Sequence, residues 1–203
     1  MSMIIISGLS GSGKSVALHA LEDLDFYCID NLPVGMLTSL ANEIHEQHLS
    51  RISNVATCID ARNRPDQLAR FPGILRELRA SGIACKILFL QADDATLLKR
   101  FSETRRKHPL SDNETLLADA ITLEHELLEP IMDNADLFID TSRTNVHQLR
   151  QLVMDSIGYR EATGLSLLLR SCGSKHGVPT EGECGCDARC LPHPSREPGW
   201  GCQ

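Results

Sequence analysis

The sequence predicts an α/β protein in which a parallel sheet carries helices on both faces. Short apolar segments alternate with longer segments of helical periodicity from residue 3 to about residue 157. The short segments are too brief to be buried helices, so they are expected to be strands. Strands that are apolar along their whole length, separated by helices, are typical of a parallel sheet buried on both sides.

Five strands are expected, each bounded by Gly, Asp, Asn or the start of a new helix. They are Met3–Ser7, Phe26–Ile29, Val55–Ile59, Lys86–Leu90 and Leu137–Ile139. Six helices are expected over Lys14–Leu24, Val34–His48, Asp66–Ser81, Ala95–Thr104, Glu114–Asn134 and Val146–Ile157. Asn113 and Asn145 stand where they can cap the last two helices, because an Asn side chain accepts a hydrogen bond from the first helical turn.

The composition is that of a globular protein and excludes several classes. Of the 203 residues, 42% are hydrophobic and 23% are charged, with a formal net charge of -7. The negative charge argues against general binding of nucleic acid. No apolar run reaches the roughly 18 residues of a membrane span. The opening segment Met1–Ile6 lacks the basic start of a signal peptide, so a cytoplasmic location is expected, where cysteines remain thiols or bind metals.

The C-terminal part of the chain differs in composition from the rest. We predict a nucleotide-binding domain over residues 1–157, a linker over 158–164 and a short, poorly ordered remnant of a second domain over 165–203. Five of the eight cysteines lie in this last part, at Cys172, Cys184, Cys186, Cys190 and Cys202. A zinc site built from the cysteines at 184, 186 and 190 with His176 and His193 is an alternative, although C-x-C spacing is tight for two ligands of one ion.

A phosphate-binding loop follows the first expected strand. The segment reads Gly8-Leu9-Ser10-Gly11-Ser12-Gly13-Lys14-Ser15 and matches the pattern G-x-x-x-x-G-K-[ST]. Glycines allow a tight turn that aims backbone N–H groups at phosphate oxygens, and the helix that follows adds the positive end of its dipole. Lys14 is expected to reach the β- and γ-phosphates of ATP or GTP, and the Ser15 hydroxyl to face Mg²⁺. The pattern predicts a P-loop NTPase-type sheet.

Two of the expected strands end in an aspartate, at Asp30 and Asp60. Ligands of open α/β sheets bind beyond the carboxyl ends of the strands, so either carboxylate could hold Mg²⁺ through water or position an attacking water. Asp60-Ala61-Arg62-Asn63 places a carboxylate, a guanidinium and an amide within four residues, and is the preferred polar cluster. Each aspartate could equally be a solvated acid or a helix cap. Asp140-Thr141-Ser142, after the fifth strand, is a weaker candidate for a base pocket.

A basic cluster precedes Pro109 and consists of Arg100, Arg105, Arg106, Lys107 and His108. These side chains could form a lid over the phosphates or a patch for RNA, since guanidinium groups suit bidentate phosphate contacts. They could equally be the solvated face of a helix, which is the usual role of a charge run.

The motifs together resemble the RapZ/YvcJ family of bacterial P-loop proteins, from the N-terminus to about residue 171. Beside the phosphate loop, the strings that carry the resemblance are Phe26–Pro33, Ile59–Asn63, Ser102–Leu110 and Leu128–Pro130. The resemblance implies ATP binding at Gly8–Ser15, a GTP-associated segment at Asp60–Asn63 and weak ATPase and GTPase activity. It also implies a role as an adaptor that delivers small regulatory RNA to an endoribonuclease in the control of amino-sugar synthesis, with a homo-oligomer possible.

The sequence departs from the family in two places. Gln91 stands where the family usually has an aspartate after the fourth strand, and the chain stops where the family continues into an RNA-binding C-terminal domain. We therefore expect weak RNA affinity for this chain. A small-molecule or nucleotide kinase with an Arg-rich lid is the alternative function, because the phosphate loop and the order of elements fit that class equally well.

Overall fold

In the computed structural model the described residues are 2–46, 54–104, 106–111 and 115–157. The chain divides into two compact units, Met1–Arg160 and Glu161–Gln203, and every described residue belongs to the first. The predicted linker, the C-terminal remnant, its zinc ligands, Asn113 and Arg105 lie outside the described residues.

The sheet has five parallel strands, as predicted, in the order β2-β3-β1-β4-β5. The strands are β1 (Ser2–Gly8), β2 (Tyr27–Ile29), β3 (Asn54–Cys58), β4 (Ala84–Gln91) and β5 (Leu137–Asp140). The central strand β1 is apolar on both faces because helices cover both. All five carboxyl ends lie at one edge of the sheet, and β1 leads into the phosphate loop there.

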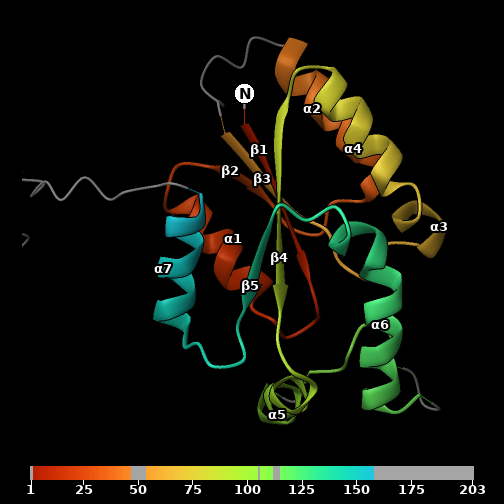
Figure 1. Cartoon of the computed structure of the whole chain (residues 1–203), viewed down its shortest axis with the longest axis vertical. Helices are drawn as coiled ribbons and strands as arrows, with labels where there is room; N and C mark the ends of the chain where they lie inside the picture. The colour runs from red at the N-terminus through yellow and green to blue at the C-terminus, as the bar shows by residue number, and fades with distance from the viewer. Residues whose placement is uncertain (1, 47–53, 105, 112–114, 158–203) are drawn as a thin grey trace, which may run out of the picture. The chain divides into compact units, whose positions relative to one another are not determined.

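Helices cover the two faces of the sheet (Figure 1). On one face α1 (Lys14–Glu22) and α7 (Val146–Ser156) bury a core that includes Ile6 and Leu149. On the other face, the 3₁₀ turn η1 (Val34–Met36), α2 (Leu37–Glu46), α3 (Pro65–Leu68), α4 (Phe71–Ala80) and α6 (Leu117–Met132) bury a core around Phe71 and Phe89. Helix α5 (Asp94–Thr104) follows β4 at the edge of the sheet that carries the phosphate loop.

Some helix boundaries differ from the sequence prediction. The helix expected over Asp66–Ser81 is two helices, α3 and α4, because Pro72 in a continuous helix would clash with the carbonyl four residues earlier. The helix expected from Val34 begins as η1, and the one expected from Glu114 begins at Leu117. The capping role of Asn145 is confirmed, because its side chain accepts the N–H of Gln148 and the Gln148 side chain accepts the N–H of Asn145.

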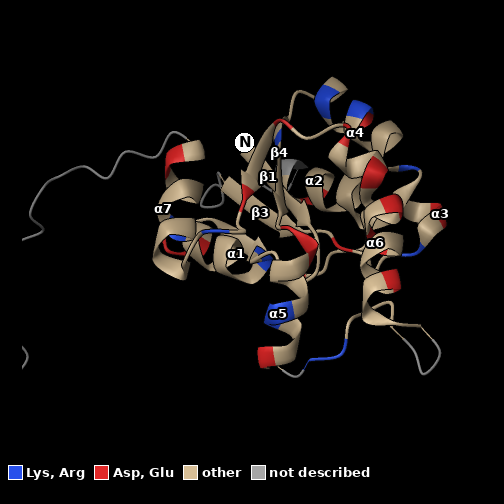
Figure 2. Cartoon of the chain, turned by 60° about the horizontal axis from the view of Figure 1, so that its bottom comes forward, with Lys and Arg blue, Asp and Glu red and all other residues tan. Residues whose placement is uncertain are grey.

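The charged residues of the described chain are interspersed over most helices, as Figure 2 shows. Helices α2, α3 and α6 differ, because each carries carboxylates and neither Lys nor Arg, and α6 is the longest of them with 16 residues. Among the described residues no helix has the length and apolar character needed to cross a membrane.

Candidate phosphate-binding site at the carboxyl ends of the strands

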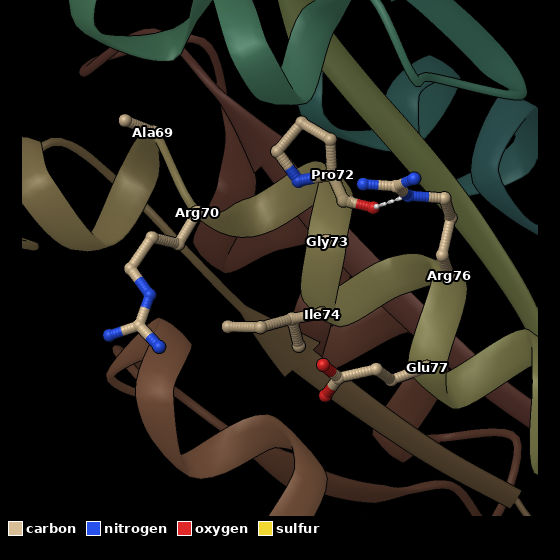
Figure 3. Close-up of a pocket in the computed structure, with 7 residues that line it drawn as sticks. All are labelled: Ala69, Arg70, Pro72, Gly73, Ile74, Arg76 and Glu77. Carbon is tan, nitrogen blue, oxygen red and sulfur yellow. Dashed lines mark hydrogen bonds between the residues drawn. The ribbon is translucent and has the colours of Figure 1, made fainter.

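A shallow hollow on the surface of α4 is separate from the carboxyl ends of the strands. Seven residues line it: Ala69, Arg70, Pro72, Gly73, Ile74, Arg76 and Glu77 (Figure 3). Arg76 donates to the Pro72 carbonyl at 3.3 Å, and Arg70 extends away from it. Among these seven residues no set of polar groups converges on one point, so we assign the hollow no function.

The phosphate loop requires glycine at its first and last turns. Gly8 has φ +140°, and a Cβ atom there would lie 2.0 Å from the carbonyl oxygen of Leu90 on β4. Gly13 has φ +102°, and its Cβ would lie 2.5 Å from the Leu149 side chain. Gly13 is also the N-cap of α1 and offers no side-chain cap, so the first N–H groups of the helix remain directed at the loop.

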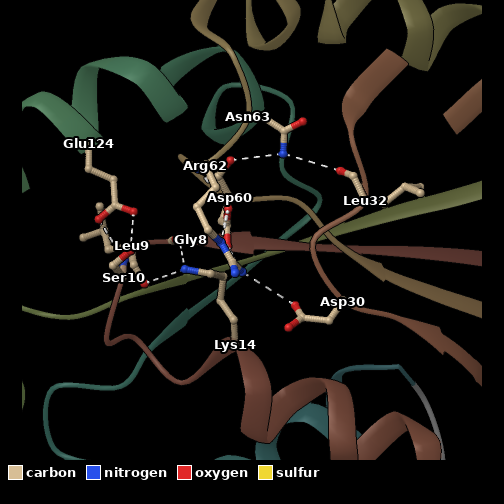
Figure 4. Close-up of polar contacts among 10 residues, drawn as sticks. All are labelled: Gly8, Leu9, Ser10, Lys14, Asp30, Leu32, Asp60, Arg62, Asn63 and Glu124. Atoms are coloured by element: carbon tan, nitrogen blue, oxygen red, sulfur yellow. Dashed lines mark hydrogen bonds and ion pairs between the residues drawn. The ribbon is translucent and has the colours of Figure 1, made fainter. Parts of the chain in front are cut away.

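Lys14 closes the loop from the inside (Figure 4). Its ammonium donates to the carbonyl oxygen of Gly8 at 2.7 Å and to that of Leu9 at 2.9 Å. The ammonium therefore lies beside the N-terminal end of α1, the position that the sequence predicts for contact with phosphate. The neighbouring Ser15 is exposed.

A buried polar network anchors the loop to α6, and sequence reasoning missed it. The Glu124 carboxylate, with no solvent exposure, accepts the Ser10 N–H at 2.8 Å, the Ser10 hydroxyl at 2.7 Å and His108 Nε2 at 3.0 Å. His108 Nδ1 in turn accepts the N–H of Leu110 at 3.1 Å, which makes Nε2 the nitrogen that donates to Glu124. The network therefore joins the phosphate loop, α6 and the segment after α5.

The electrostatics of Glu124 follow from these contacts. Burial raises the pKa of this carboxyl, but the hydrogen bond from His108, the Lys14 ammonium and the bonds from Ser10 outweigh it and hold the pKa below its usual value. A signal was present in the sequence, because Glu124 lies at helical spacing between the buried residues Ile121 and Leu128. A carboxylate on the apolar face of a helix requires a partner, and here the partner is the phosphate loop.

Arg100 and Thr141 fasten the middle of the loop. Arg100 donates to the Gly11 carbonyl at 2.9 Å, to the Thr141 hydroxyl at 3.0 Å and to the Thr141 carbonyl at 2.6 Å. The buried Thr141 hydroxyl is 3.0 Å from the carbonyl oxygen of Ser12. Arg100 thus contacts the loop backbone at Gly11, and Thr141 contacts it at Ser12.

Of the remaining residues of the predicted lid, the structure describes Arg106, Lys107 and His108, and it places them differently. His108 is buried in the Glu124 network, which corrects its assignment to a lid or a solvated face, because its ring packs against Phe101 and both ring nitrogens have partners. Arg106 and Lys107 are exposed, as expected of a solvated charge run.

Gln91 pairs with Asp140 across β4 and β5, and its carbonyl accepts the Thr141 N–H at 2.8 Å.

Asp60 lies at the end of β3, beside β1, and is 3% exposed. Arg62 covers its carboxylate: Nε donates at 2.9 and 3.1 Å, Nη2 at 2.5 Å and the backbone N–H at 3.0 Å. Burial raises the pKa of Asp60, but the hydrogen bonds from Arg62 and the charge of Lys14 hold it below its usual value. Lys14 therefore acts on two buried carboxylates, Asp60 and Glu124 (Figure 4).

Asn63 holds the turn that follows β2. Its side chain accepts the N–H of Val34 at 2.8 Å and donates to the carbonyls of Leu32 at 3.4 Å and Asp60 at 3.3 Å. Asn31 in this turn has φ +52°, a left-handed conformation that Asn tolerates better than most residues. The turn presents Asp30, 58% exposed, with its carboxylate 4.0 Å from Arg62. The structure thus brings Asp30, Asp60 and Arg62 together, and gives Asn63 contacts within the fold.

The donor atoms near the loop fit Mg²⁺ by their chemistry. A serine hydroxyl at Ser15 and a carboxylate at Asp60 are the hard oxygen ligands that this ion takes from proteins. In this structure Arg62 binds the Asp60 carboxylate. No group of three or more His, Cys, Asp or Glu in the described part of the chain could hold a metal by itself.

A parallel sheet of this order, whose central strand enters a glycine-rich loop closed by lysine, defines a P-loop NTPase-type domain. The chain belongs to the RapZ-like family: the model of the RapZ-like N-terminal domain matches residues 1–160. A "Nucleotide-binding protein" of Alkalilimnicola ehrlichii is 55% identical over 196 residues, which cover 97% of this chain and 68% of the relative. Its counterpart in Nitrosococcus oceani is 54% identical over 98% of this chain and 69% of the relative. The chain thus spans about two thirds of the length of these relatives.

Solved structures with the same fold have little sequence in common with this chain. A sugar kinase from Janibacter sp. HTCC2649 superimposes with a TM-score of 0.54 at 17% identity, over 82% of this chain and 99% of the kinase. A shikimate kinase from Bacteroides thetaiotaomicron gives a TM-score of 0.50 at 17% identity, over 77% of this chain and 98% of the kinase. These likenesses show that the fold is that of the P-loop kinases.

Proposed function

We propose that the chain binds a nucleoside triphosphate, ATP or GTP, with Mg²⁺ at Gly8–Ser15 and hydrolyses it slowly. The observation that carries the proposal is the loop itself: a glycine-built turn after the central strand, with the uncapped N-terminus of α1 and the Lys14 ammonium on one side of it. Such a loop offers several N–H donors and a positive charge to a polyanion. Both relatives described above are named as nucleotide-binding proteins, which supports this proposal.

Each residue of the site has a distinct role in this proposal. Lys14 exchanges the carbonyls of Gly8 and Leu9 for phosphate oxygens, and the N–H groups from Gly11 to Ser15 surround the β-phosphate. Ser15 and Asp60 are the protein groups that hold Mg²⁺, directly or through water. Mg²⁺ supplies charge neutralisation of the β- and γ-phosphates. The fastening of the loop by Glu124 and Arg100 means that little reorganisation is needed on binding.

Slow hydrolysis follows from the same contacts. Asp60 and Glu124 are the two carboxylates on which Lys14 acts, and both are held by hydrogen bonds from protein groups. A general base needs a lone pair directed at the attacking water and a pKa near the working pH, whereas both of these carboxyls have a lowered pKa. Nucleotide turnover in this domain is therefore suited to a regulatory signal.

The cellular role we propose is that of the family resemblance, a nucleotide-dependent adaptor for a small regulatory RNA and an endoribonuclease, assembled as a homo-oligomer. Helix α6 carries only negative charges, so it repels a phosphate backbone. RNA contacts are thus assigned to other surfaces of the protein, and the domain over 1–160 supplies the nucleotide site.

The test is a nucleotide titration of the wild-type chain and Lys14→Ala. Losing charge-assisted hydrogen bonds to phosphate should weaken binding at least about tenfold. Lys99→Ala is the matched control, because Lys99 is an exposed lysine on α5 whose pair with Glu103 is solvated. Equal affinity of Lys14→Ala and wild type would refute the proposal. Stoichiometric phosphorylation of a small hydroxylated substrate, in place of slow hydrolysis, would establish the kinase alternative.

A further inference from the structure

Arg62 binds the two Asp60 oxygens that a metal ion held by this carboxylate would need. Its guanidinium contacts both oxygens of Asp60, and its backbone N–H binds one of them. The guanidinium is on the solvent side, with 47% of the side chain exposed, whereas the carboxylate beneath it is almost completely buried. Arg62 therefore covers Asp60 on its solvent side, and the two side chains lie against each other in Figure 4.

The contact is a consequence of charge and of chain geometry. A buried carboxylate needs a counter-charge or several donors, and a residue two positions along the chain, past the turn after β3, can supply both. Lys14 adds its charge without a hydrogen bond to Asp60, because its hydrogen bonds go to the carbonyls of Gly8 and Leu9. Asp60 is thus neutralised by a cation that belongs to the same chain.

A second carboxylate lies within reach of the same guanidinium. Asp30 is 4.0 Å from Arg62 Nη2, and it is 58% exposed at the end of β2. Arg62 therefore lies between a buried carboxylate to which it is bound in bidentate fashion and an exposed one at the limit of an ion pair. A side chain in this position can leave the first carboxylate without losing all electrostatic compensation.

We propose that Arg62 is an exchangeable counter-cation, which neutralises Asp60 in the nucleotide-free protein and gives up its oxygens to Mg²⁺ when the nucleotide binds. The inference rests on the proposed function. On release, the guanidinium turns toward Asp30 and the terminal phosphate, where its planar donors match phosphate oxygens. Arg62 thereby links occupation of the phosphate loop to a change at the ends of β2 and β3.

Removal of Arg62 should have opposite effects on nucleotide binding with and without Mg²⁺. Mg²⁺ and the guanidinium compete for the same two oxygens, so removal of Arg62 should tighten the response to Mg²⁺. Without Mg²⁺ the same removal leaves the Asp60 charge compensated by Lys14 alone beside a polyanion, so nucleotide binding should weaken. A purely structural role for Arg62 would weaken binding under both conditions.

The experiment measures binding of a fluorescent ATP analogue to the full chain, with Mg²⁺ titrated and with EDTA present. For Arg62→Ala the Mg²⁺ concentration at half-maximal binding should fall about fivefold to tenfold. This is the effect expected of one charge-assisted hydrogen-bonded pair, reduced because about half of the Arg62 side chain is exposed to solvent. In EDTA the affinity should fall by a similar factor. Arg62→Lys should show a smaller shift in the same directions, since an ammonium cannot bind both oxygens in parallel.

Two controls test whether the effect is specific to the contact between Arg62 and Asp60. Arg64→Ala removes a guanidinium two residues away, whose pair with Asp66 is exposed, and should change neither quantity. In an Asp60→Asn background, Arg62→Ala should no longer shift the Mg²⁺ response. An unchanged or higher Mg²⁺ requirement in both Arg62→Ala and Arg62→Lys overturns the role of Arg62 as counter-cation, provided that Lys14→Ala weakens binding at least about tenfold. If Lys14→Ala binds like wild type, the nucleotide site itself is refuted.

Discussion

The buried contact between α6 and the phosphate loop can be tested through Glu124. Replacement by alanine removes the acceptor of three hydrogen bonds and leaves the Ser10 N–H, the Ser10 hydroxyl and His108 Nε2–H inside the protein without it. Breaking a buried charged pair costs about 3–5 kcal/mol, and we expect a loss of about 4 kcal/mol in the free energy of unfolding for Glu124→Ala.

Glu124→Gln should cost much less, for a geometric reason. Two of the donors, the Ser10 N–H and His108, bind the same oxygen Oε2, and the Ser10 hydroxyl binds Oε1. A glutamine can place its carbonyl oxygen at the Oε2 position and its amide group at the Oε1 position, where the hydroxyl can rotate to accept. The loss should then be about 1–2 kcal/mol, because the contacts remain but the charge does not.

The assay is urea unfolding followed by far-UV circular dichroism, with the midpoint and slope compared between variants. Glu126→Ala, on the exposed side of the same helix, is the control and should change stability by less than about 0.5 kcal/mol. The reasoning is refuted if Glu124→Gln is as destabilising as Glu124→Ala, or if Glu124→Ala lies within about 1 kcal/mol of wild type.

Two further predictions concern the loop and its carboxylates. Gly8→Ala would put a Cβ 2.0 Å from the Leu90 carbonyl at φ +140° and should cost at least about 3 kcal/mol. Gly73→Ala in α4, where the new Cβ meets nothing within 4 Å, should instead stabilise by about 0.5–1 kcal/mol. The measurement is the melting temperature of the two variants. A shift of both melting temperatures in the same direction would contradict the predicted clash at Gly8. Asp60 and Glu124 have lower pKa values in the folded protein than their ordinary values of 3.8 and 4.5, so their ionised forms stabilise the fold. This stabilisation is fully present above the ordinary pKa values, and it is lost as the pH falls through the pKa values of the folded protein. The urea concentration at the unfolding midpoint should therefore decrease as the pH is lowered below about 4.5, and it should decrease less steeply in Glu124→Gln than in wild type. An equal slope in the two proteins would count against a lowered pKa of Glu124.

The helix boundaries show how local signals can conflict. The apolar periodicity over residues 66–81 continues through Ala69 and Arg70 and suggested one helix, yet Pro72 breaks it into α3 and α4. Periodicity reports which residues face the core, and both short helices present their apolar residues to the same core. The break comes from backbone sterics, which a hydrophobic pattern does not record.

The polar cluster after β3 was predicted only in part. The proximity of Asp60 and Arg62 follows from their separation of two residues, whereas the contacts of Asn63 depend on where the chain after β2 lies. The Asn63 side chain binds Val34, 29 residues earlier, so its amide is committed to the turn that presents Asp30. No spacing rule within Asp60–Asn63 indicates this contact.

The chain sequence was sufficient for the α/β class, the five strands and the phosphate loop, because each depends on residues within one turn or one strand of one another. Hydrophobic runs, the spacing of glycines and the position of Lys14 are local properties of the sequence. They determine the strands and the phosphate loop without contacts from distant parts of the chain. The tertiary structure alone decided what holds that loop: Glu124 meets Ser10 across 114 residues, and Arg100 meets Gly11 across 89. Such pairs form only once the helices pack against the sheet, since the cost of burying each charge is offset only by a partner that folding brings to it.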